Sequence, residues 1–114
     1  MPTRYYLSLP NPERARGSDP SLAFTAVSAE GFAEQLQSAL RGTGLYEQWR
    51  GKQADPDAVD PALGATDPNA SVLGSQDDLH IDLVVTSNIS GDVLKHRLRL
   101  LAGSGWELRD VTAA

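Results

Sequence analysis

Residues 79–86 alternate between large aliphatic side chains and mostly polar ones, and no other segment constrains the fold as strongly. The aliphatic set is Leu79, Ile81, Leu83 and Val85, and the alternate set is His80, Asp82, Val84 and Thr86. Because successive side chains on a strand point to opposite faces, this period of two predicts a strand with one buried and one open face. The chain is therefore expected to build a sheet that is covered on one side only.

Four other segments have the alternation or the β-branched and aromatic content of strands. They are residues 5–9, 22–27, 71–74 and 106–111. Residues 71–74 and 79–86 are joined by the short polar segment 75–78, which predicts a β-hairpin. Residues 22–27 are expected to pair back on 5–9, and 106–111 to form the final strand.

Helices are predicted between these strands by capping residues and by apolar spacing. Ser28 is a favourable N-cap for a helix that runs to about residue 41, in which Phe32, Leu36 and Leu40 share one face. A short second helix is expected before Gly51. A last helix is predicted from Ser90 to about residue 102, and Gly103 follows it in a position suited to positive φ.

This succession of elements predicts a single α+β domain over residues 1–114. We expect a two-layer sandwich, with a mainly antiparallel sheet and helices packed on one face. The element order resembles that of the ferredoxin-like α/β plait, a resemblance that implies a shape and no particular activity. Residues 11–20 are predicted to form an exposed loop, and residues 53–70 an acidic connection whose three Asp-Pro pairs favour turns or short helix starts.

The composition excludes several classes of function. The formal net charge of −5 opposes binding to a nucleic-acid backbone, and the absence of cysteine excludes thiolate chemistry and cysteine-ligated metals. The sequence has no apolar stretch of membrane-spanning length and no secretion signal, so a cytoplasmic location is expected by default. Phosphate-binding, dinucleotide-binding and metalloprotease motifs are also absent, so no cofactor is predicted.

A candidate ligand site emerges on the polar side of the predicted sheet. His80 and Asp82 lie two residues apart on one strand, so their side chains share a face. Tyr6 from the first strand, with Glu107 and Arg109 from the last, is expected on the same surface. This set combines an imidazole, carboxylates, a guanidinium and a phenol. The alternative interpretation is a solvated or dimer-buried face whose polar residues only maintain solubility.

Two charged clusters elsewhere in the sequence are further candidates for binding sites. Lys95, His96 and Arg99 form a candidate anion-binding group, although basic residues near a helix C-terminus also offset the helix dipole. The acidic residues of the 53–70 connection, including Asp55, Asp57 and Asp60, lack the spacing and the distal glutamate of a calcium-binding loop. No metal site is therefore predicted.

The leading functional hypothesis is a non-enzymatic module that binds a protein or a small ligand. A homodimer is favoured, because the open face is expected to carry Tyr6, Val84 and Val111 among polar groups. The alternative is a small enzyme in which His80 acts as general base, Asp82 or Glu107 orients it, and Arg109 binds an anionic substrate. No catalytic residue is assigned on this basis.

Overall fold

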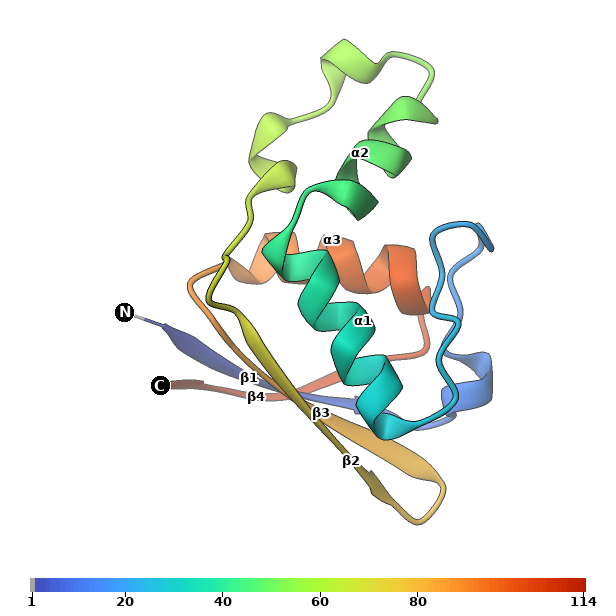
Figure 1. Ribbon diagram of the computed structural model, residues 1–114, viewed down its shortest axis with the longest axis vertical. Helices are drawn as coiled ribbons and strands as arrows, with labels where there is room; N and C mark the ends of the chain where they lie inside the picture. The colour runs from blue at the N-terminus through green and yellow to red at the C-terminus, as the bar shows by residue number, and fades with distance from the viewer. Residues whose placement is uncertain (1) are drawn as a thin grey trace.

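The sheet is antiparallel and four-stranded, with the strand order β2-β3-β1-β4 (Figure 1). The computed structural model describes residues 2–114. Its strands are β1 (Thr3–Leu9), β2 (Ser71–Asp77), β3 (His80–Ser87) and β4 (Glu107–Ala113). Its helices are α1 (Ala29–Arg41), α2 (Gly44–Gly51) and α3 (Gly91–Ala102), with short 3-10 turns at Pro12–Arg14, Pro56–Ala58 and Pro61–Gly64.

The predicted helices are confirmed, together with the residues that start them. The Ser28 side chain accepts a hydrogen bond from the Gly31 amide at 3.1 Å, and Ser90 accepts one from the Val93 amide at 3.3 Å. Each cap satisfies an amide that has no partner inside its own helix. At the end of α3, Gly103 has a φ of +61°, a conformation that glycine adopts without steric cost.

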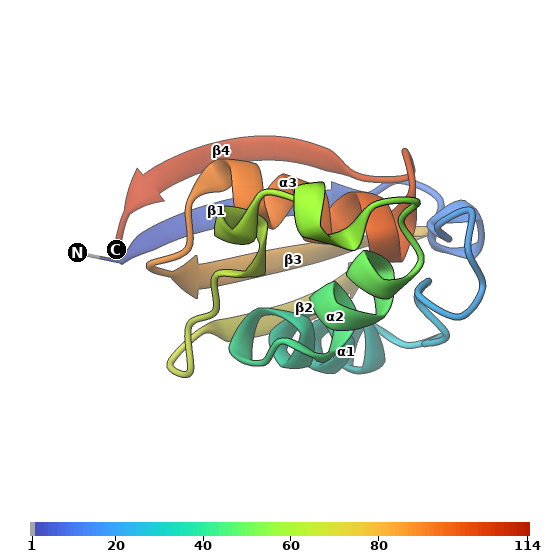
Figure 2. The same cartoon turned by 90° about the horizontal axis from the view of Figure 1, so that it is seen from above.

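Helices α1 and α3 cover the same side of the sheet, as Figure 2 shows. Helix α1 lies over β2 and β3, while α2 contacts α1 and α3 at the end away from the strands. Between the layers lies an apolar core that includes Leu7, Leu83, Phe32, Leu36 and Leu98, none of which is more than 2% exposed. This α+β architecture leaves the other side of the sheet without helices.

Residues 22–27 are not a strand, so this prediction was wrong. Both edges of β1 are already paired, one with β3 and the other with β4, which leaves no edge for a further strand. The segment instead runs in irregular backbone over the helices and buries Leu22, Ala23 and Phe24. The Phe24 amide donates to the Leu101 carbonyl at 2.8 Å, so tertiary contacts take the place of sheet pairing.

The hairpin between β2 and β3 is confirmed, but its turn is shorter than predicted. Strand β2 continues to Asp77, which pairs with His80, so only Asp78 and Leu79 form the turn. Leu79 consequently lies outside the strand and is 79% exposed, whereas it had been expected among the inward-facing aliphatic residues. Within the strand itself the alternation holds, because Ile81, Leu83 and Val85 are buried.

Strand β4 contains an irregularity that moves Val111 to the side of the sheet opposite to the predicted one. The register against β1 shifts between Tyr6 and Leu7, which leaves Arg109 as the extra residue of a bulge. Val111 therefore pairs with Tyr5 and lies on the helix-covered side. Strict alternation predicts that Val111 lies beside Tyr6. A single extra residue in the strand is enough to move the following side chains to the opposite face of the sheet.

The acidic connection is ordered by contacts to the helices. Two of its Asp-Pro pairs start 3-10 turns, and the Asp60 carboxylate accepts from the Ala62 amide at 2.9 Å. The Arg97 guanidinium donates to the carbonyls of Leu63 and Ala65 at 3.0 and 2.8 Å. The segment is thus attached to α3 rather than free in solvent.

Candidate functional site

The side of the sheet without helices, here called the open face, carries the alternate residues of all four strands. Strand pairing aligns these side chains in rows across the sheet. One row contains Ser75, Asp82, Ser8 and Glu107, and the next contains Leu73, Val84, Tyr6 and Asp110. Side chains that are directly opposite on neighbouring strands have Cβ atoms about 5 Å apart, so members of a row are in contact distance.

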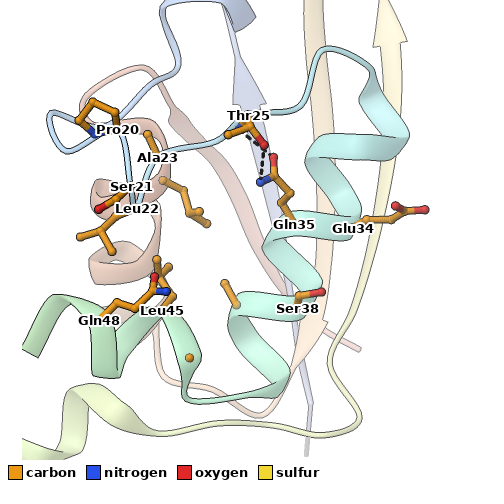
Figure 3. Close-up of a pocket in the computed structure, with 13 residues that line it drawn as sticks. Pro20, Ser21, Leu22, Ala23, Thr25, Glu34, Gln35, Ser38, Leu45 and Gln48 are labelled. Atoms are coloured by element: carbon orange, nitrogen blue, oxygen red, sulfur yellow. Dashed lines mark hydrogen bonds between the residues drawn. The ribbon is translucent and has the colours of Figure 1, made fainter.

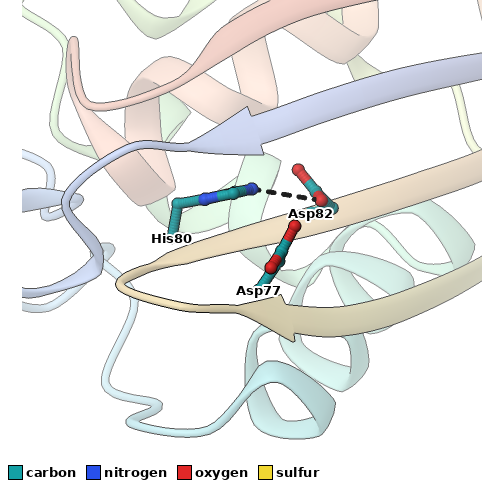
Figure 4. Close-up of side chains that lie close together, drawn as sticks. All are labelled: Asp77, His80 and Asp82. Carbon is teal, nitrogen blue, oxygen red and sulfur yellow. Dashed lines mark hydrogen bonds and ion pairs between the residues drawn. The ribbon is translucent and has the colours of Figure 1, made fainter.

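Asp82 of the polar row also belongs to a cluster at the β2–β3 hairpin. Asp77 pairs with His80 across the hairpin, and Asp82 follows on the same face of β3. His80 Nε2 and Asp82 Oδ2 lie 3.3 Å apart, and one ligand atom from each of the three residues lies within 4.8 Å of the others (Figure 4). Two carboxylates and an imidazole are therefore close together at the hairpin end of the open face.

The central row is apolar over three of its four strands. Leu73 is 71% exposed, and Val84 and Tyr6 beside it are half-buried. Exposed aliphatic side chains next to an aromatic ring in the middle of a sheet face are a feature of association surfaces. Sequence alternation placed Tyr6 and Val84 correctly on one side, but it contained no signal that Leu73 would join them.

Four of the five residues predicted as a ligand site form two separate pairs, and the fifth, Tyr6, lies opposite Val84 in the apolar row. His80 and Asp82 form one pair on β3, while Arg109 Nη2 lies 3.5 Å from Glu107 Oε2 on β4. Strand β1 separates these two strands, which places their backbones about 10 Å apart. Each of five pockets in the described part of the chain is lined by other residues. The five predicted residues therefore lie on an open surface and do not line a cleft.

The three candidate anion-binding residues of α3 are not brought together. Lys95 lines a pocket against β4, whereas Arg99 is exposed beside Gly103. The His96 ring packs against the edge of Trp49, with ring centres 4.3 Å apart. Burial lowers the pKa of His96 below its usual range, and the nearby Arg97 and Arg99 lower it further. A neutral imidazole contributes no charge to an anion site.

Arg97, within the same basic run, is a buried residue that sequence analysis did not single out. Its side chain is 0% exposed and donates to the carbonyl of Ala39 at 2.9 Å, as well as to the acidic connection. Burial lowers the pKa of its guanidinium. In the sequence, the only indication of this burial is that Arg97 lies next to Leu98, one of the apolar residues of the helix. This indication is weak, because solvent-exposed residues of a helix also have apolar neighbours in the sequence.

Asp67 is a second buried polar residue that the sequence did not identify. Its carboxylate accepts hydrogen bonds from the Asn69 amide, the Asn88 amide and the Ser87 hydroxyl, each at 2.9 Å. The backbone bonds from Asn88 and Asn69, followed by the Ser87 bond, hold the pKa of Asp67 below its ordinary value. The residue thus joins the acidic connection to the end of β3. The Asp-Pro pattern indicated a turn here, but not this contact.

An open groove of about 580 Å³ lies where residues 20–25 pass α1 and α2 (Figure 3). Gln35 projects from α1 toward this segment, and its Oε1 accepts from the amides of Thr25 and Ala26 at 3.0 and 2.8 Å. Its Nε2 donates to Thr25 Oγ1 at 3.1 Å. Both polar atoms of the Gln35 amide therefore hold this segment against α1.

A smaller apolar pocket of about 270 Å³ lies between α3 and β4. Leu94 and Leu98 line it from the helix, and Leu108 and Val111 line it from the strand. The bulge at Arg109 creates this pocket, because it directs both β4 side chains to the covered side of the sheet. Leu108 and Val111 remain 37% and 47% exposed, so the helix covers this strand incompletely.

The chain was compared with known proteins in three ways. A scan against protein-family models found no matching family, and searches of curated proteins and of solved structures found no significant match. Among residues 2–114, no helix combines the length and the apolar character that crossing a bilayer requires.

Proposed function

We propose that this protein is a non-enzymatic binding module and that the open face is its binding surface. The observation that carries the proposal is the one-sided covering of the sheet, which leaves the apolar row of Leu73, Val84 and Tyr6 facing solvent. The partner that fits this surface is a second copy of the chain. A patch with an apolar centre and a polar surround suits the self-complementary contact of a two-fold dimer.

The distribution of charge on the open face supports this occupant. Asp77 and Asp82 lie toward the hairpin end of the sheet, where Glu107 is paired with Arg109, whereas Arg4 lies at the opposite end, paired with Thr86 and Thr112. When two copies meet face to face with their strands reversed, Arg4 of each copy faces the acidic end of the other. The same arrangement brings the two apolar rows together at the centre, so charge and apolar contacts favour one orientation.

The test compares two substitutions that place the same charge at exposed apolar positions. Leu73→Glu lies in the centre of the open face, while Val27→Glu, at a residue 89% exposed, lies outside it. We expect sedimentation to show a dimer for the wild type and for Val27→Glu, and a dissociation constant raised at least about tenfold for Leu73→Glu. Circular dichroism verifies that both variants are folded. A wild type that stays monomeric at high concentration, or equal behaviour of the two variants, would overturn the proposal.

The alternative function is a small enzyme in which His80 and Asp82 form an acid–base pair. The 3.3 Å separation of their side chains favours this candidate. The engagement of Arg109 with Glu107, on a strand that is not adjacent to β3, counts against its role in binding the same substrate. A screen of turnover with small anionic substrates tests the alternative. Activity that is present in the wild type and lost in His80→Ala would favour the enzyme.

We also infer that the finer fold class is the ferredoxin-like plait. What supports this inference is the presence of two interleaved units, in which β1 and β2 are connected through α1 and α2, and β3 and β4 through α3. Strand β3 of the second unit lies between β1 and β2, and strand β1 of the first unit lies between β3 and β4. Helix α2 and the acidic connection are additions to this plan. Because the plait hosts many unrelated functions, the inference adds no activity.

A further inference from the structure

We propose that Asp77, His80 and Asp82 form a binding site for a divalent transition-metal ion of the zinc type. The three residues supply one imidazole nitrogen and two carboxylate oxygens, and these ligand atoms lie within 4.8 Å of one another (Figure 4). Imidazole nitrogen and carboxylate oxygen are both ligands of Zn²⁺ and related ions, whose open sites take three protein ligands and keep a fourth position for water. The proposal goes beyond the binding function above and does not depend on dimer formation.

The distances within the cluster are close to those that a metal requires. Bonds of about 2.1 Å in tetrahedral geometry separate two ligand atoms by about 3.4 Å. His80 Nε2 and Asp82 Oδ2 are already 3.3 Å apart. Asp77 is exposed, so its side chain has room to rotate toward the other two ligands.

The hairpin holds the three side chains on one face without help from a flexible loop. Asp77 and His80 are direct cross-strand partners, and Asp82 is two residues beyond His80 on β3. Positions on paired strands keep ligand side chains in place before the ion binds, which reduces the cost of ordering them. The adjacent Asp78, in the turn, is not part of the cluster.

Ser8 provides an independent observation that points to a ligand. It is directly opposite Asp82 in the β1–β3 register, so its side chain belongs to the open face. Although no helix covers this face, Ser8 is only 1% exposed, and its Oγ has no hydrogen-bond partner among residues 2–114. A buried hydroxyl without a partner is rare in folded proteins. A water molecule bound to the metal in the fourth position would supply one.

The charges and donor types of the cluster favour this class of ion over calcium or magnesium. The two carboxylates offer a charge of −2, which a divalent cation neutralises, and an imidazole binds a metal through a ring nitrogen without adding charge. Calcium takes six or more oxygen ligands, and magnesium prefers oxygen ligands in octahedral geometry, so neither uses the imidazole well. The nitrogen donor is therefore the group that decides the identity of the ion.

Metal binding is measured by calorimetric titration of chelator-treated protein with Zn²⁺ at neutral pH, and by the visible absorption of Co²⁺. We expect one ion per chain. His80→Ala and Asp82→Asn should each weaken binding at least about tenfold, and Ser8→Ala about tenfold through the lost outer contact. His96→Gln, which changes the other histidine, and Asp78→Asn, which removes an acidic neighbour, are matched controls and should bind like the wild type.

Two results would overturn the site: a wild type that binds neither ion at millimolar concentration, or a loss of affinity in the two controls equal to that in His80→Ala. The second result would show that the ion is held only by general negative charge. Repeating the titration in Leu73→Glu separates this proposal from the dimer proposal. A monomeric variant that still binds the ion supports the site, whatever the oligomeric state of the wild type.

Discussion

Arg97 shows how a single side chain can connect elements that are distant in the sequence. Its guanidinium reaches from α3 to the Ala39 carbonyl in the last turn of α1 and to two carbonyls around the 3-10 turn at Pro61–Gly64. Carbonyls in the last turn of a helix have no partner within it and carry the negative end of the helix dipole. A buried cation without a carboxylate is thus stabilised by backbone carbonyls alone.

Removal of this guanidinium is expected to destabilise the protein strongly. Arg97→Met leaves three buried or half-buried carbonyls without their donor, which should lower the free energy of unfolding by about 3 kcal/mol. Arg99→Met, two residues away at an exposed position, is the control and should change it by less than about 0.5 kcal/mol. Urea denaturation measures both values. Equal stability of the two variants would contradict the proposed role.

At the scale of elements, Gly74 determines how closely β2 approaches α1. It lies on the helix-covered side of the strand, paired with Leu83. A Cβ atom built at Gly74 would overlap the carbonyl oxygen of Ala29 and lie 3.2 Å from the Cβ of Ala33. The contact between the strand and the first turns of the helix therefore requires a residue without a side chain.

Gly74→Ala is expected to force β2 and α1 apart and to lower the free energy of unfolding by about 1–3 kcal/mol. Gly51→Ala is a suitable control, because a Cβ there meets no atom within 4 Å. We expect this control to lie within about 0.5 kcal/mol of the wild type. Thermal and urea unfolding of the two variants compare the effects. A Gly74→Ala protein as stable as Gly51→Ala would show that the helix moves aside freely.

At the scale of the whole molecule, the pH dependence of stability combines the half-buried His96 and the buried Asp67. The folded state lowers the pKa of His96 from 6.5, so the unfolded chain takes up its proton first as the pH falls. Stability should therefore begin to decrease below about pH 6.5. The pKa of Asp67 is lowered from 3.8, so its stabilising contribution is complete above that pH and is lost as the pH falls through its folded-state pKa.

The measurement is the free energy of unfolding by urea at pH 7.5, 5 and 3. We expect a first decrease between pH 7.5 and 5 that is smaller in His96→Gln, which cannot take up this proton. A second decrease toward pH 3 should be smaller in Asp67→Asn, which has no carboxylate to protonate. Constant or rising stability of the wild type from pH 7.5 to 5 would contradict the sign derived for His96.

Local patterns in the sequence determined most of the elements of this protein. The period of two in β3 and the apolar spacing of α1 depend only on backbone geometry, and the caps at Ser28 and Ser90 depend on the adjacent turn. The polar face that carries His80 and Asp82 follows from the same alternation. These features could be predicted because each is decided by residues within a few positions of one another.

The tertiary structure alone decided which strands are neighbours and where the alternation breaks. Residues 22–27 have the composition of a strand but find no free edge on β1, and the bulge at Arg109 moves Val111 across the sheet. Arg97 and Asp67 are buried because residues far away in the chain supply their partners. Strand pairing and burial depend on how all segments of the chain compete for the same strand edges and for the same core. A local sequence pattern cannot predict the outcome, because the competing segments lie far apart in the sequence.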